Sequence, residues 1–179
     1  MKLLNFIKSK SDLIITPVIG LLACLLIAGP KILNPSYVDW LMGGDPLKDY
    51  LGWSIFRETE WLFPIGLNPK YGLDISSSVV YSDSIPLFAI AFKVLGPLLP
   101  QQFQYFGFWT LLCLILQYWF GLKIISLFTR NQLVIFISAG LFLFSPAMLW
   151  RIGLHEALIA HFLLICLLYT SPSPRDQRG

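Results

Sequence analysis

Long runs of apolar residues decide what this chain can fold into. Residues 13–33, 103–128 and 133–150 are close to or above the roughly twenty apolar residues that cross a bilayer as a helix. Hydrophobic residues make up 56% of the chain and charged residues 13%, against roughly a quarter charged in ordinary globular domains. We therefore expect an all-α integral membrane protein, a multi-spanning helical bundle.

Two further apolar segments are less regular. Residues 85–99 are interrupted by Lys93 and end among prolines, and residues 155–165 are too short to cross alone. The expected spans are thus residues 13–33, 85–99, 103–128, 133–150 and an incomplete span at 155–165.

A strongly acidic loop, residues 34–84, separates the first expected span from the second. It contains seven carboxylates and only three cations. The carboxylates are Asp39, Asp45, Asp49, Glu58, Glu60, Asp74 and Asp83, and the cations are Lys48, Arg57 and Lys70. Lys and Arg are retained on the cytoplasmic side more strongly than acidic residues. Because the N-terminus carries Lys2, Lys8 and Lys10, we expect a cytoplasmic N-terminus and an extracytoplasmic loop.

The orientation of the later segments depends on residues 85–99. If every expected span crosses, the turn that carries Arg130 lies outside and Arg151 lies inside. An outward Arg130 runs against the positive-inside rule, and a re-entrant second span would remove that conflict.

Residues 166–179 are expected to be a non-native tail. The residues from Cys166 to Asp176 can be back-translated, codon by codon, into the transposase adapter used to prepare sequencing libraries. This match predicts a gene cut off within a helix, so residues 1–165 are expected to be the truncated transmembrane domain of a longer polytopic protein.

Several classes of function find no support in the sequence. The three cysteines, Cys24, Cys113 and Cys166, lie in apolar runs without the spacing of a disulfide framework or a zinc site. No basic run with interleaved aromatic residues occurs, so we expect no nucleic-acid partner. No phosphate loop, nucleotide fingerprint or nucleophile elbow is present.

The acidic loop contains one clear helix signal. Asp45 at the N-cap and Pro46 at the first helical position are what a helix start prefers. Apolar residues then follow at amphipathic spacing, and three aromatic residues thicken the apolar side: Leu47, Tyr50, Leu51 and Ile55, with Trp53, Phe56 and Trp61. We expect this helix to lie in the membrane surface.

The order of segments along the chain is known from other proteins. A membrane span comes first, then an outward loop with Gly-Gly-Asp at the start of an interfacial helix, and then many further spans. This order resembles the N-terminal part of the GT-C class of membrane glycosyltransferases. More closely, the chain resembles an uncharacterised family of bacterial multi-spanning proteins related to GT-C enzymes, over about residues 40–165. The residues that carry this resemblance are Gly43-Gly44-Asp45-Pro46, Tyr50-Leu51-Gly52-Trp53 and segments 63–69, 82–87 and 103–107.

The resemblance implies a role for Asp45. In GT-C enzymes an acidic residue of the first outward loop acts as general base toward the acceptor or helps to hold a divalent cation, Mg²⁺ or Mn²⁺. A carboxylate beside the incoming hydroxyl, with its pKa raised at a dry membrane edge, suits that chemistry. The alternative is the structural N-cap described above. Asp49, one helical turn later, is a candidate second metal ligand, with a solvated helix face as its alternative.

Five other residues are candidates for binding the substrate. Asp83 lies at the mouth of the second expected span, where a helix-cap role is the alternative. Arg57 suits a phosphate, unless it pairs with neighbouring glutamates. Lys93 implies a partner or a cavity, unless it snorkels to the interface. Arg151 and His155 are candidates for a lipid-linked anion, with a polar cap on the last helix as the alternative.

The function implied by the resemblance is transfer of a sugar from a polyprenyl-phosphate carrier to an extracytoplasmic glycan, lipid or protein, in the bacterial inner membrane. A transporter or lipid-linked-glycan flippase is the rival, with Lys93, Gln104 and Gln117 lining a path and the acidic loop as a lid. A scaffold without activity is the third possibility.

Overall fold

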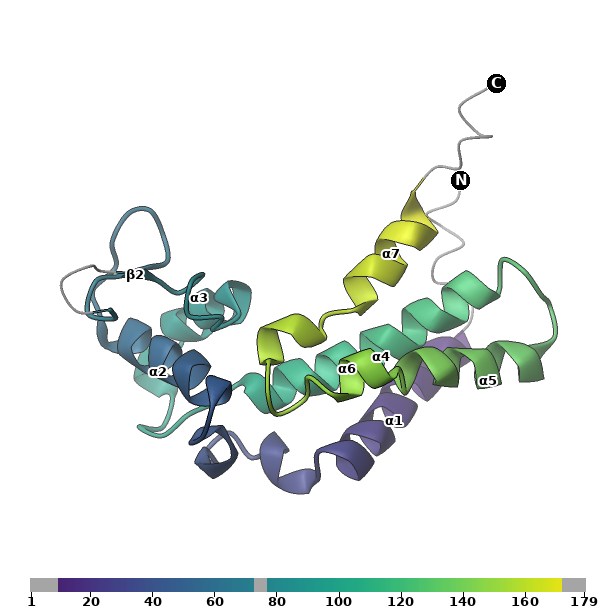
Figure 1. Cartoon of the computed structure of the whole chain (residues 1–179), viewed down its shortest axis with the longest axis horizontal. Helices are drawn as coiled ribbons and strands as arrows, with labels where there is room; N and C mark the ends of the chain where they lie inside the picture. The colour runs from purple at the N-terminus through teal and green to yellow at the C-terminus, as the bar shows by residue number, and fades with distance from the viewer. Residues whose placement is uncertain (1–9, 73–76, 172–179) are drawn as a thin grey trace, which may run out of the picture. The chain divides into compact units, whose positions relative to one another are not determined.

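A computed structural model describes residues 10–72 and 77–171, with only the backbone of residues 10–13 (Figure 1). The N-terminal Lys2 and Lys8, Asp74 of the acidic loop, and residues 172–179 of the expected tail lie outside the described residues. The chain divides into two compact units. We call residues 30–109 with 150–159 the loop unit, and residues 1–29, 110–149 and 160–179 the helical unit.

The helical unit is built from apolar helices. It contains α1 (Lys10–Ile27), most of α4 (Phe106–Ile125), α5 (Gln132–Leu143), α6 (Pro146–Leu149) and α7 (Phe162–Thr170). The Asn131 side chain caps α5 by accepting from the backbone amides of Leu133 and Val134, which satisfies amides that a helix start leaves unpaired. Gly20 allows α1 to approach the backbone of α4 at Ile115, where a Cβ atom would overlap.

Two helices of the described chain are long and apolar enough to cross a membrane: Phe106–Ile125 and the stretch Gln132–Leu149. They match the third and fourth expected spans, and Pro146 begins α6 after the short break that follows α5. The apolar part of α1, Ile14–Ile27, is shorter. The prediction of an apolar, mostly helical chain is confirmed at this level.

The expected second and fifth spans differ from the structure. Residues 85–99 form the nine-residue helix α3 (Pro86–Val94), followed by the 3-10 turn η5 (Gly96–Leu98). A nine-residue helix is about 13 Å long, less than half the hydrocarbon thickness. Residues 155–165 also do not form one helix, because the 3-10 turn η6 (Glu156–Ile159) precedes α7. Pro97 lies in the turn that follows α3.

The loop unit is folded throughout its described residues. After the 3-10 turns η2 (Pro30–Leu33) and η3 (Asp39–Leu41) comes α2 (Asp45–Glu58), which packs against α3 (Figure 1). Between these helices a short hairpin pairs β1 (Leu67–Asn68) with β2 (Ser77–Ser78), antiparallel, with Leu67 opposite Ser78. The acidic loop therefore folds together with later segments of the loop unit, since their shared core also includes Ala89, Phe103 and Tyr105.

Two aromatic residues of the apolar side of α2 belong to that core, whereas Leu51 on the same helix is 42% exposed; a location of α2 in the membrane surface stays a prediction. Trp53 and Phe56 are almost fully buried. The Trp53 indole donates to the Phe103 carbonyl oxygen at 3.1 Å, and its ring meets the Tyr105 ring edge-on at a centroid distance of 5.0 Å. Amphipathic spacing identifies an apolar face, and protein covers its two largest buried side chains, Trp53 and Phe56.

Gln104 ties together the two ends of the segment 30–109. Its Nε2 atom donates to the carbonyl oxygens of Ile32 (2.7 Å) and Asn34 (3.0 Å), and its Oε1 atom accepts from the Gly107 amide. A Cβ atom at position 107 would overlap the Ile32 carbonyl, so glycine permits this close approach. Both amide hydrogens of Gln104 are used within the fold, which gives this residue a structural role.

Candidate functional site

The first residue of α2 carries the most accessible carboxylate of the candidate site. Gly44 has φ +63°, a conformation that favours glycine, and it turns the chain into the helix. The expected N-cap role of Asp45 is wrong, because the cap position belongs to Gly44 and Asp45 is the first helical residue. The Asp45 side chain meets His155 instead, with Oδ2 3.1 Å from Nδ1.

A tight turn presents His155 to Asp45. The His155 amide donates to the Arg151 carbonyl oxygen at 2.8 Å, and Gly153 adopts φ +79°. The buried Glu156 side chain accepts from the Gly153 amide at 2.5 Å, and the Glu156 carbonyl accepts from the Trp109 indole at 2.8 Å. These bonds fix the turn, so the position of His155 follows from backbone and buried contacts. The Arg151 side chain lies half-buried in the same turn.

A lysine on the same face of α2 joins two further carboxylates. Lys48 Nζ lies 2.7 Å from Asp83 Oδ2 and 3.8 Å from Asp49 Oδ1. The hydrogen bond to Asp83 is the largest cause of the raised pKa of Lys48; burial opposes it, and the charges of Asp83, Asp49 and Asp45 add to it. The structure thus brings together Asp45, Asp49, Asp83 and His155, four of the residues singled out in the sequence; with Lys48 we call them the carboxylate cluster.

Asp83 is held in a strained backbone. It has φ +53°, and Ile85 has φ +50°, a rare conformation for a β-branched residue. Such residues cost of the order of 1–3 kcal/mol each and persist only where surrounding contacts impose them. The Ser84 hydroxyl donates to the Asp49 carbonyl oxygen at 2.6 Å, and the Tyr105 hydroxyl donates to the Ser84 carbonyl oxygen.

Gly52 makes room for this strained segment. A Cβ atom at position 52 would overlap the side chains of Ser82 and Ser84, so a glycine is required for α2 to lie against them. The expected cap role of Asp83 is not what the structure shows, because α3 begins at Pro86 after Ile85 and receives no side-chain cap. Asp83 pairs with Lys48 instead.

Asp49 is buried, so its interpretation as part of a solvated helix face is wrong. Its side chain is 2% exposed, and Oδ1 has no hydrogen-bond partner. Burial raises the pKa of Asp49 to about 7; Lys48 lowers it, and the nearby charges of Asp83, Glu156 and Asp45 raise it further. This carboxyl group is therefore shared between protonated and ionised forms near neutral pH.

The cluster does not fit a divalent cation as it is arranged. Among residues 10–72 and 77–171, no group of three or more His, Cys, Asp or Glu side chains could hold a metal ion. The ammonium of Lys48 occupies the position between Asp49 and Asp83 where a shared cation would lie. The two predicted ligands, Asp45 and Asp49, have His155 and Lys48 as their respective neighbours.

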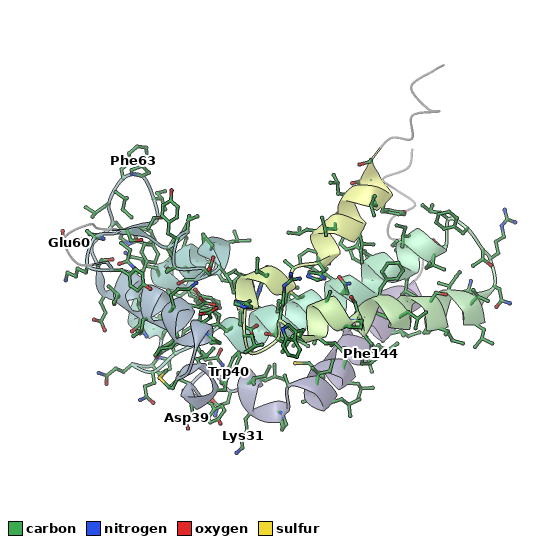
Figure 2. All side chains as sticks on the ribbon, in the orientation of Figure 1. Lys31, Asp39, Trp40, Glu60, Phe63 and Phe144 are labelled. Atoms are coloured by element: carbon green, nitrogen blue, oxygen red, sulfur yellow. The ribbon has the colours of Figure 1, made fainter. Side chains whose placement is uncertain are left out.

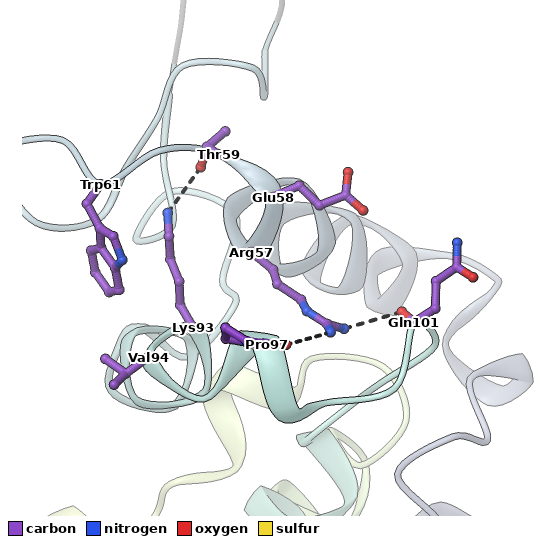
Figure 3. A pocket seen from close by; sticks show the side chains of 9 residues that line it. Arg57, Glu58, Thr59, Trp61, Lys93, Val94, Pro97 and Gln101 are labelled. Carbon is purple, nitrogen blue, oxygen red and sulfur yellow. Dashed lines mark hydrogen bonds between the residues drawn. The ribbon is translucent and has the colours of Figure 1, made fainter.

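The other two candidates, Arg57 and Lys93, lie together elsewhere in the loop unit. They line a pocket of about 420 Å³, which Figure 3 shows. Arg57 donates to four backbone carbonyl oxygens, those of Gly96, Leu99, Pro100 and Gln101, at 2.7–3.3 Å. Carbonyl groups at the end of η5 thus occupy the guanidinium, and neither expected partner, a phosphate or a glutamate, is needed to explain it.

Lys93 is enclosed by aromatic rings. Its Nζ atom lies 4.0 Å from the ring centre of Phe56 and 4.7 Å from that of Trp61. It donates to Thr59 Oγ1 and to the Glu60 carbonyl oxygen, both at 3.3 Å. The expected partner therefore exists inside the protein, and this ammonium joins α3 to the end of α2 through cation–π contacts.

Sequence reasoning missed Lys48 and gave Glu156 no role. Lys48 could have been found, since Asp45, Lys48 and Asp49 follow the i, i+3, i+4 spacing of one helix face. No local signal shows that Glu156 is buried, because its environment comes from residues distant in sequence, among them Trp109.

A protein family described as a domain of unknown function (DUF6311) matches residues 17–179. No curated protein and no solved structure matches the chain.

Proposed function

The chain belongs to the DUF6311 family, and we propose that it is part of a bacterial inner-membrane glycosyltransferase. In this proposal it transfers a sugar from a polyprenyl-phosphate carrier to an extracytoplasmic glycan, lipid or protein. The proposal starts from the GT-C resemblance of the segments around Asp45 and depends on the arrangement of the carboxylate cluster.

The Asp45–His155 pair is the observation that carries the proposal. The two side chains are 57% and 46% exposed, and their facing atoms lie 3.1 Å apart. A pair this exposed to solvent contributes little to stability. A carboxylate oriented by a histidine and open to solvent is instead a suitable general base.

In the proposed reaction Asp45 accepts the proton of the acceptor hydroxyl. The acceptor oxygen forms a bond to the anomeric carbon of the sugar, and the bond from that carbon to the phosphate oxygen breaks. The electron pair of the broken bond leaves on polyprenyl phosphate. His155 orients Asp45 through Nδ1, and the proton taken by Asp45 returns to solvent through the exposed side of the pair.

The leaving phosphate requires positive charge nearby. Lys48 is 41% exposed and its pKa is raised, so it stays protonated beside the cluster. Arg151 belongs to the turn that presents His155. We assign these two residues to the phosphate of the carrier, with Arg151 kept from the sequence-based expectation. Asp83 holds Lys48 in position.

The order of the helices supports an outward position for the cluster. With α3 too short to cross, successive crossings by α1, α4 and the α5–α6 stretch put residues 30–105 and 150–159 on one side. Both segments belong to the loop unit, as this arrangement requires. Arg130 then lies in the cytoplasm, in agreement with the positive-inside rule, and Arg151 lies outside. This is the re-entrant alternative for residues 85–99.

The rival function is transport or flipping of a lipid-linked glycan. The three residues expected to line its path make contacts within the protein. Gln104 uses both amide hydrogens on backbone carbonyls, and Lys93 is enclosed by Phe56 and Trp61. Gln117 donates to the Phe142 carbonyl oxygen at 3.0 Å. These contacts give each of the three side chains a structural partner.

The direct test is sugar transfer to an endogenous acceptor in membranes that contain the full-length protein. We expect Asp45→Asn to lower transfer by about 10²–10⁴-fold, the usual contribution of a general base. Asp39→Asn is the matched control, since Asp39 is an exposed carboxylate of the same acidic loop outside the cluster. Undiminished transfer by Asp45→Asn would remove the proposed base.

A further inference from the structure

Apolar side chains gather beside the open end of the hairpin that follows α2, on the segments that precede β1 and follow β2. Phe63 is 89% exposed and Tyr81 80% exposed, and Figure 2 shows Phe63 at the end of the loop, pointing away from the rest of the unit. We call this group the apolar tip; its members are Trp61, Leu62, Phe63, Ile65, Val80 and Tyr81.

The hairpin brings the two arms of the apolar tip together. The Gly66 carbonyl oxygen accepts from the Val79 amide at 2.9 Å and from the Ser78 hydroxyl at 3.0 Å. No charged residue occurs between Glu60 and Lys70. The tip is therefore a compact apolar surface, of the kind that marks contact with a membrane or another protein.

The base of the apolar tip is held firmly to the core. Trp61 contacts the ring of Phe56 edge-on, with ring centres 6.3 Å apart, and Lys93 Nζ lies over both rings. The same ammonium donates to the Glu60 carbonyl oxygen at 3.3 Å. The core therefore fixes the root of the tip while its end stays uncovered.

Chain connectivity favours lipid as the partner of the apolar tip. Helix α4, one of the two helices long enough to cross a membrane, begins at Phe106 within the loop unit. Helix α1 ends at Ile27, directly before the unit begins at Pro30. In the proposed topology α1 and α4 both cross the membrane, so the unit joined to them lies at the bilayer surface, where Trp and Tyr side chains are favoured.

We propose that the apolar tip inserts into the headgroup region of the bilayer that α4 crosses, about 5–10 Å deep, as interfacial apolar surfaces do. This inference rests on the membrane-spanning part of the proposed function and not on sugar transfer. Anchoring the tip fixes the orientation of the loop unit toward lipid-linked molecules.

Position-specific fluorescence in lipid tests the proposal. The full chain, with its three cysteines replaced by alanine, receives one cysteine at a time and an environment-sensitive label, NBD. It is reconstituted into vesicles of phosphatidylethanolamine and phosphatidylglycerol that contain a nitroxide-labelled lipid. The labelled variants are Phe63→Cys at the tip, Lys70→Cys as the exposed control of the same hairpin, and Ile137→Cys on the exposed side of α5.

We expect the nitroxide lipid to quench the label at position 63 several-fold more strongly than the label at position 70, with a blue-shifted emission at 63. Equal, water-like emission at both positions, with quenching at 137, would overturn the tip insertion and leave the spanning helices in place. A blue shift at 63 without lipid quenching would identify a protein partner and also overturn it. Absence of quenching at 137 would remove the membrane-spanning premise itself.

Discussion

The loop unit contains two charged regions that use similar residues in different ways. In the carboxylate cluster, ionisable groups face one another, and the Asp45–His155 pair is open to solvent. In the pocket at Arg57 and Lys93, backbone carbonyls and aromatic rings occupy the cations. Cations engaged in this way hold chain segments together, whereas an exposed carboxylate beside a histidine can exchange a proton. Partners, more than residue type, distinguish a chemical from a structural role.

The largest effect on stability is expected from pH, through Asp49. The pKa of its carboxyl group is about 7 in the folded unit, against an ordinary value of 3.8, which the unfolded chain keeps. Between these values the folded protein keeps a proton that the unfolded chain has lost, so stability falls as pH rises from about 4 to about 7 and is constant above. At about 1.4 kcal/mol per pKa unit the upper limit is about 4 kcal/mol.

The measurement for Asp49 is the apparent melting temperature in detergent between pH 4 and pH 8, for the wild type and Asp49→Asn. The amide resembles the protonated acid, so the variant should gain stability relative to the wild type as pH rises. A constant difference between the two curves would mean that Asp49 does not titrate in this range. Asp49 would then not count among the ionisable groups of the carboxylate cluster.

A smaller loss of stability is expected from Arg57→Ala. The substitution leaves the four carbonyl oxygens around η5 without their donor, and a hydrogen bond to a charged group contributes about 1.5–3 kcal/mol. The melting temperature should fall, while sugar transfer per folded molecule stays at the wild-type level. Glu58→Gln, at the neighbouring exposed position, is the control. Loss of sugar transfer at unchanged stability would mean that Arg57 has a chemical and not a structural role.

The smallest effect is expected from removal of divalent cations. Lys48 provides the positive charge between Asp49 and Asp83, so a chelator should leave transfer in membranes nearly unchanged. Loss of transfer with EDTA, restored by Mg²⁺ or Mn²⁺, would instead support the metal role that the resemblance implies for Asp45 and Asp49.

Local features of the structure could be predicted from the sequence. The start of α2 at Gly44-Asp45-Pro46 and the cap of α5 by Asn131 depend on neighbouring residues only. The partner of the apolar side of α2 could not be predicted, because Phe103 and Tyr105 come from a distant segment. Periodicity shows which side of a helix is apolar and not what covers it.

The residues of the site could be predicted only in part from the sequence, because their contacts also come from distant segments. Asp45 and His155 were each singled out, but their contact joins segments that are far apart in the sequence. The burial of Asp49 depends on folding of the entire unit. Likewise, Arg57 and Lys93 carry suitable charges for substrate binding, and only the carbonyl and aromatic partners in the structure show how they are used.

The central claim is that Asp45 and His155 act as one unit, and a double-mutant cycle on sugar transfer tests it most directly. Loss of the charge-assisted contact in His155→Gln should cost about 10- to 100-fold. Since His155 acts through Asp45, the double variant Asp45→Asn with His155→Gln should transfer no more slowly than Asp45→Asn alone. Losses that multiply in the double variant would show that the two residues act independently and would contradict the account.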